Sequence, residues 1–145
     1  MQRLKIFFIL FIAFLFFSCS GKTNEQAFLD GLSNIDVQIA EGRQTKALKS
    51  LKRLQKKAVN STNYISIVKR QLKLNSIPDA LISLQTGIKN FPDSPELSAL
   101  LTSILIDSGK PAEALPYCEK LKDTPYASLG AEASILSDIA FNSFN

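Results

Sequence analysis

The chain of 145 residues has no histidine and no tryptophan, and it has only two cysteines and one methionine. Histidine is the commonest general base in enzymes and the commonest metal ligand, so its absence removes the usual starting point for both kinds of site. The sequence also contains no Gly-rich phosphate loop and no Gly-x-Ser-x-Gly turn. We therefore predict that the protein is not an enzyme, and we expect no cofactor.

The two cysteines, Cys19 and Cys118, are too few for a structural zinc site, so no metal is expected. Cys118 lies four residues after Ala114 in a segment with helical spacing, which favours a small core residue. A reactive or intermolecular thiol is the alternative for Cys118. Cys19 requires a separate interpretation, because it follows a run of apolar residues near the start of the chain.

The first residues have the pattern of a secretory signal peptide. Arg3 and Lys5 precede an apolar run over residues 6–17, and small residues follow. Twelve residues in a helix span roughly 18 Å. The hydrocarbon core of a membrane is about 30 Å thick, so a transmembrane anchor is the weaker interpretation.

The segment Phe16-Phe17-Ser18-Cys19 resembles a bacterial lipobox, in which the cysteine is acylated and becomes the first mature residue. This resemblance implies a protein of the bacterial cell envelope, tethered to a membrane through lipidated Cys19. The predicted organisation is a signal peptide over 1–18, a flexible tether over 19–26 and a folded domain over 27–145. Ordinary signal cleavage nearby, with no lipid, is the alternative.

A seven-residue phrase that begins at Gly42 returns at Asn75 and at Gly109, and each copy ends in Ala-Leu. The Ala-Leu pairs lie 33 and then 34 residues apart. A fixed period in this range is typical of stacked helical hairpins, each of which buries its apolar face against its neighbours. We therefore predict an all-α fold, and proteins with such folds usually bind other molecules rather than transform them.

The repeat resembles the tetratricopeptide repeat (TPR), which has 34 residues and two helices per unit. Residues 61–94 carry the resemblance through Tyr64, Ile67, Ala80, Leu84, Gly87 and Pro92. Residues 95–122 carry it through Leu101, Gly109, Ala114, Cys118 and Leu121, and residues 28–60 carry it through Gly42, Ala47, Leu51 and Leu54. The resemblance implies a solenoid of about three TPR-like hairpins. Residues 125–141 predict a further terminal helix.

The chain departs from the TPR pattern at three positions of the first helices. Val68 and Thr102 occur where the family has a small glycine, and Gln71 occurs where it has an aromatic residue. Near the end of the chain, Ile135 and Ile139 leave apolar surface on the terminal helix. That surface indicates either an interaction site or a truncated remnant of a longer repeat protein.

Basic residues are concentrated in one part of the chain. Residues 43–73 contain ten lysines and arginines and no acidic residue, whereas residues 74–145 contain four basic and nine acidic residues. A solvated helix face explains the placement of the lysines but not the absence of carboxylates. The alternative is a face that attracts anionic lipid, a glycan or an acidic protein. The candidate basic face is Lys46, Lys49, Lys52, Arg53, Lys56 and Lys57.

The TPR resemblance also implies a groove lined by the first helix of each hairpin. In this chain the lining would be Asp36, Ile39, Ile65, Lys69, Lys73, Ala99, Ser103 and Asp107. We therefore predict a membrane-anchored scaffold whose partner is an envelope protein or peptide. The alternatives are a peripheral module that binds anionic lipid or glycan through residues 43–73, and a remnant. A nucleic-acid partner is not expected for an exported protein.

Overall fold

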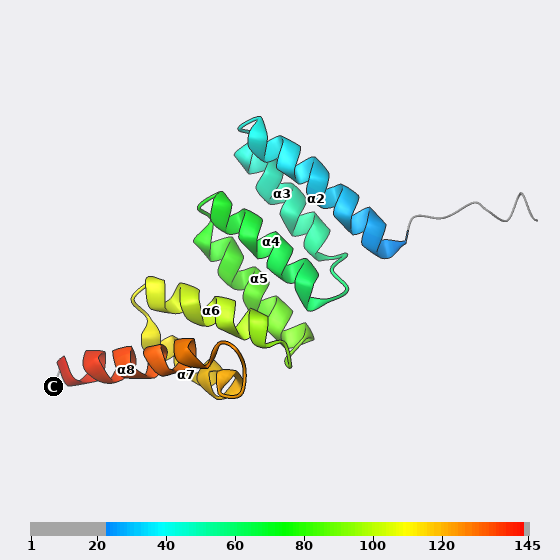
Figure 1. Ribbon diagram of the computed structural model, residues 1–145. Helices are drawn as coiled ribbons and strands as arrows, with labels where there is room; N and C mark the ends of the chain where they lie inside the picture. The colour runs from blue at the N-terminus through cyan, green and yellow to red at the C-terminus, as the bar shows by residue number, and fades with distance from the viewer. Residues whose placement is uncertain (1–22, 144–145) are drawn as a thin grey trace, which may run out of the picture.

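The computed structural model describes residues 23–143, with side chains up to residue 142, so Cys19 and the predicted signal peptide lie outside the described residues. Seven α-helices and one short 3-10 helix make up this part of the chain, which contains no strand (Figure 1). The helices are α2 (Asn24–Ala40), α3 (Gln44–Gln55), α4 (Ser61–Lys73), α5 (Ile77–Asn90), α6 (Pro95–Asp107), α7 (Pro111–Cys118), η1 (Glu119–Leu121) and α8 (Ala127–Ser143). The all-α prediction is confirmed.

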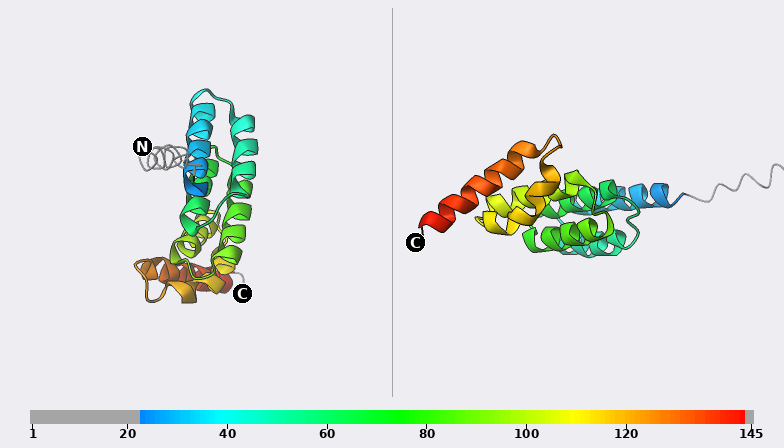
Figure 2. Two further views of the ribbon diagram at one scale, coloured as in Figure 1. Left: turned by 90° about the vertical axis from the view of Figure 1, so that its right-hand side faces the viewer. Right: turned by 90° about the horizontal axis from the view of Figure 1, so that it is seen from below.

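The helices pack as consecutive antiparallel hairpins. Helix α2 pairs with α3, α4 with α5 and α6 with α7, and the hairpins stack in chain order (Figures 1 and 2). The last helix, α8, packs on α7 and α6. The predicted arrangement of about three hairpins and a terminal helix is therefore confirmed.

Each recurrence of the seven-residue phrase forms the turn inside one hairpin. Its first residue, Gly42, Asn75 or Gly109, has a positive φ of 72°, 55° or 71°. The next residue donates its backbone N–H to a carbonyl five residues earlier, at 2.8 to 2.9 Å. This left-handed closure is the Schellman motif, which ends a helix and satisfies its last carbonyls. The phrase recurs because every first helix must end in this way.

Helix α2 begins earlier than the sequence indicated. The hydroxyl of Thr23 accepts a hydrogen bond from the backbone N–H of Gln26 at 3.2 Å and so caps the helix at its first turn. The helix therefore starts at Asn24, inside the segment 19–26 that the sequence predicts as a tether. Only the part of that segment before Thr23 remains without a described structure.

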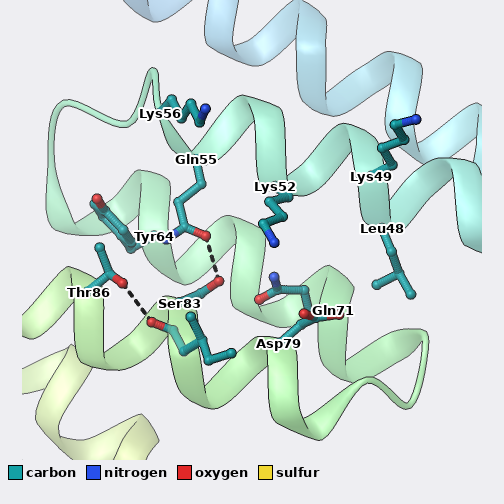
Figure 3. Close-up of a pocket in the computed structure, with 11 residues that line it drawn as sticks. Leu48, Lys49, Lys52, Gln55, Lys56, Tyr64, Gln71, Asp79, Ser83 and Thr86 are labelled. Carbon is teal, nitrogen blue, oxygen red and sulfur yellow. Dashed lines mark hydrogen bonds between the residues drawn. The ribbon is translucent and has the colours of Figure 1, made fainter.

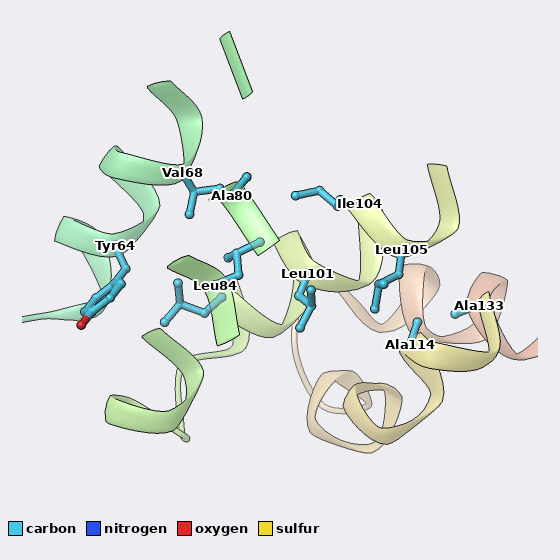
Figure 4. Close-up of a cluster of buried hydrophobic side chains, with 10 residues drawn as sticks. Tyr64, Val68, Ala80, Leu84, Leu101, Ile104, Leu105, Ala114 and Ala133 are labelled. Atoms are coloured by element: carbon cyan, nitrogen blue, oxygen red, sulfur yellow. The ribbon is translucent and has the colours of Figure 1, made fainter. Parts of the chain in front are cut away.

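Two hydrophobic clusters form the core, and α4 belongs to both. Ile67 packs with the residues of the first hairpin. Tyr64 and Val68 pack with the residues of α5, α6, α7 and α8 (Figure 4). Cys118 is half-buried against this second cluster, as expected for a small core residue.

The hairpin of α4 and α5 is closely packed, because a Cβ atom at Gly87 would lie 3.0 Å from the Tyr64 ring. The Tyr64 hydroxyl accepts a hydrogen bond from the Asn90 side chain at 2.8 Å, which holds the ring in place. In α8, by contrast, Ile135, Ile139 and Phe141 expose more than half of their surface. None of the described helices is long and apolar enough to cross a membrane.

The left-handed turns lead to a stability prediction. Gly109→Ala should lower the free energy of unfolding by about 1 kcal/mol, because an L-residue with positive φ costs roughly 1–2 kcal/mol. No atom lies within 4 Å of the added Cβ, so the cost comes from the backbone alone. Asn75→Gly should instead raise the free energy of unfolding. Urea unfolding followed by circular dichroism measures both, and equal stabilities of the two variants would contradict this account of the turns.

Candidate functional site on two sides of helix α4

Helix α4 presents two nearly opposite sides to its surroundings. Tyr64 and Gln71 are seven residues apart and therefore share one side, which is buried. Ile65, Lys69 and Lys73 follow one another at four-residue spacing and share the other side, where both lysines are exposed. We call this second side, together with Asp36 of α2, the first-helix face.

An ion pair crosses the first-helix face between two hairpins. Arg70 of α4 donates from Nε to Oδ1 of Asp36 at 2.8 Å and from Nη2 to Oδ2 at 2.6 Å. The same guanidinium donates to the carbonyl of Ser66 at 2.9 Å, which fixes its orientation. The hydrogen bonds from Arg70 lower the pKa of Asp36, and the charge of Lys73 adds to the effect. The Asp36 carboxylate is therefore already engaged by cations of its own chain.

The other predicted groove residues differ in how much of their surface is exposed. Ser103 is half-buried and Asp107 is exposed at the end of α6. Ala99 is only 5% exposed and does not line an open groove. The reason is that α6 packs against α4, α5, α7 and α8, which leaves little of its surface free. How closely the terminal helix covers α6 cannot be predicted from helical spacing alone.

The six residues of the predicted basic face are all exposed. Lys46, Lys49, Lys52 and Arg53 lie on the exposed part of α3, away from its buried residues Ala47, Leu51 and Leu54. Lys56 and Lys57 follow in the turn directly after α3. The two edges of this face border different hollows. Arg53 and Lys57 line a hollow of about 230 Å³ beside α2, whereas Lys52 and Lys56 line a larger cleft beside α5.

The larger hollow, which we call the α3–α5 cleft, has a volume of about 460 Å³ (Figure 3). It lies between α3 and α5 and is floored by α4. Its lining residues are Leu48, Lys49, Lys52, Gln55, Lys56, Tyr64, Gln71, Asp79, Ile82, Ser83 and Thr86. It therefore lies on the side of α4 away from the first-helix face.

Most polar groups of the cleft already have partners. Ser83 donates its hydroxyl to Oε1 of Gln55 at 2.7 Å, and Asp79 accepts a hydrogen bond from the Ser76 hydroxyl at 2.7 Å. Gln71 is the exception among the cleft residues: it is 3% exposed, and its Oε1 is buried with no hydrogen-bond partner. Figure 3 shows its amide pointing into the space between α3 and α5, below Lys52. Sequence reasoning missed Gln71 as a site residue, although its place at an aromatic position of the repeat was a signal.

The ion pair between α2 and α4 gives a pH-dependent prediction. The pKa of Asp36 is lower in the folded than in the unfolded chain, so its contribution to stability is present above the ordinary value of 3.8 and is lost as the pH falls through the lowered folded value. At pH 7 Asp36→Asn should lower stability by about 0.2–1 kcal/mol, as for other solvent-exposed pairs. Urea unfolding at pH 7 and pH 3 should show the difference shrinking at acid pH.

Asp93→Asn is the control for this measurement, because Asp93 is exposed in the turn before α6 and makes no ion pair within residues 23–143. It should leave stability unchanged at both pH values. A difference between wild type and Asp36→Asn that is as large at pH 3 as at pH 7 would contradict the role given to the carboxylate charge.

Comparison with known proteins gives similarities both in sequence and in structure. No protein-family model matches the chain. Over 108 residues the chain is 38% identical to an uncharacterized protein of Treponema pallidum (strain Nichols). The match covers 74% of this chain but only 17% of that protein, so the chain spans a small part of its relative's length.

The fold is similar to that of PcrH in its crystal structure in complex with the chaperone binding region of PopB. The TM-score is 0.54 at 15% sequence identity, and the match covers 79% of this chain and 98% of the PcrH chain. At this sequence identity, the similarity shows the fold alone. The chain therefore has an all-α fold of sequential TPR-like hairpins.

Proposed function

We propose that the chain is a binding module that holds a segment of a partner protein against its first-helix face. The observation that carries this proposal is the likeness of its hairpin stack to PcrH, which was solved with a bound region of PopB. A stack of hairpins provides a rigid, extended surface for such binding, because each hairpin is fixed by its neighbours.

The charges of the first-helix face favour an acidic partner. Lys69 and Lys73 are exposed, and neither forms an ion pair with a carboxylate in the described part of the chain. Asp36 does not neutralise the face, because Arg70 already engages it. Exposed, unpaired cations of this kind steer an acidic segment toward the face and fix its register there.

The proposed setting is the bacterial cell envelope, with the module held at a membrane through a lipid on Cys19. The lipobox resemblance and the preceding signal-peptide pattern support this part of the proposal. Each buried methylene of an acyl chain contributes about 0.8 kcal/mol, so several chains on one cysteine would hold the protein firmly. The partner would then be an envelope protein or peptide.

A second candidate function is the binding of anionic lipid or glycan through the basic side of α3. The observation that favours it is that all six residues of the predicted basic face, on α3 and in the turn after it, are exposed, in a stretch that has no acidic residue between positions 43 and 73. Each basic residue close to an anionic membrane contributes roughly 1 kcal/mol. The two candidates place the decisive charges on different helices, so substitution separates them.

The first-helix face can be tested by charge reversal. Lys69→Glu combined with Lys73→Glu should reduce the crosslinked capture of partner protein from the native membranes by about tenfold or more, because attraction becomes repulsion. Arg53→Glu combined with Lys57→Glu makes the same change of charge at the end of α3 and the turn after it, and should leave capture intact. Equal losses in the two variants, quantified by mass spectrometry, would contradict a specific role for the first-helix face.

The membrane anchor can be tested separately. Cys19→Ser should move the full-length protein from the detergent phase into the aqueous phase on phase separation, because the serine cannot carry the thioether-linked lipid. Cys118→Ser is the matched control and should stay in the detergent phase with the wild type. An unchanged distribution of Cys19→Ser would show that Cys19 does not anchor the protein.

A further inference from the structure

The α3–α5 cleft contains a feature that the fold itself does not explain. Gln71 replaces the aromatic residue of the repeat pattern, and its Oε1 is buried without a hydrogen-bond partner. A buried acceptor that lacks a partner costs roughly 1–3 kcal/mol. An apolar residue at this position would avoid the cost, so the amide is best accounted for by a ligand that donates a hydrogen bond to it.

The rim of the cleft carries positive charge. Lys49 and Lys52 of α3 and Lys56, directly after α3, line this rim, and none of them makes an ion pair with a carboxylate among the described residues. Asp79 is the one acidic residue in the lining, and one of its oxygens accepts the Ser76 hydroxyl. The ligand must therefore combine a hydrogen-bond donor with an acidic group.

The walls of the cleft are partly apolar. Leu48 of α3 and Ile82 of α5 both line it, and Ile82 exposes 59% of its surface. A volume of about 460 Å³ lies within the range of roughly 300–1,000 Å³ that is usual for ligand sites. A simple inorganic anion would leave most of this space and both apolar walls uncovered.

We propose that the α3–α5 cleft binds an acidic polypeptide segment that also carries an apolar side chain. A main-chain N–H of the segment donates to Oε1 of Gln71, a carboxylate pairs with Lys52, and the apolar side chain covers Leu48 and Ile82. This site is separate from the first-helix face, since Gln71 and Lys73 lie on nearly opposite sides of α4. The protein would thus hold two segments, one on each side of its hairpin stack.

The test uses the full-length chain in micelles of an uncharged detergent and a fluorescent octapeptide of alternating leucine and glutamate. Fluorescence anisotropy measures its affinity, with the leucine–glutamine octapeptide as the neutral control. Gln71→Met removes the amide at similar length. The pair Lys52→Gln and Lys56→Gln removes charge from the cleft, and the pair Arg53→Gln and Lys57→Gln removes the same charge from the other edge of α3.

We expect Gln71→Met to weaken binding of the acidic peptide about 2- to 10-fold, the effect of one hydrogen bond. Its melting temperature should be unchanged or higher, because a buried amide oxygen without a hydrogen-bond partner is lost. The Lys52 and Lys56 double variant should weaken binding at least as much, and the Arg53 and Lys57 double variant should bind like wild type.

Three results would overturn the proposal. The first is wild-type affinity in Gln71→Met, which would mean that the amide does not contact the peptide. The second is equal weakening by the two double variants, which would mean that net charge alone accounts for the loss of binding. The third is displacement of the peptide by glycerol phosphate at comparable concentration, which would assign the cleft to a phosphate headgroup instead of a polypeptide.

Discussion

The left-handed residue that ends each first helix is the constraint on which the structure depends. Gly42, Asn75 and Gly109 reverse the chain within a few residues, so that each second helix returns along its first helix. Because the turn recurs every 33 or 34 residues, the hairpins stack in register. In this register the first helices lie beside one another. The second helices α3 and α5 form the walls of the α3–α5 cleft.

This arrangement separates two kinds of electrostatic environment. On the first-helix face, an arginine and an aspartate of neighbouring hairpins satisfy each other, and the lysines beside them stay available. In the α3–α5 cleft, the lysines lie at the rim near the Gln71 amide, whose buried Oε1 has no hydrogen-bond partner. The first environment stabilises contact between hairpins. The second contains a buried hydrogen-bond acceptor that no group of the described residues satisfies.

Local patterns predicted the features that depend on local structure. The turns, the hairpins and core residues such as Ala47 and Ala114 follow from helical spacing and the repeat period. The bond between Asp36 and Arg70 was not predicted, because its partners are 34 residues apart and meet only when hairpins stack. The burial of Ala99 and the unpaired Gln71 likewise depend on how closely neighbouring helices approach. Cys19 lies outside the described residues, so its lipidation stays a prediction.

Helix α4 also joins two separate apolar clusters. Ile67 belongs to the cluster of the first hairpin, and Val68, the next residue, belongs to the cluster that reaches α8. In a stack whose contacts are between neighbours, we expect such a boundary to let the units on its two sides open separately. Helices α2 and α3 would form one unit whose amide protons exchange with solvent without unfolding of the rest. Departure of that unit would remove one wall of the α3–α5 cleft, so the cleft exists only while the two units remain docked.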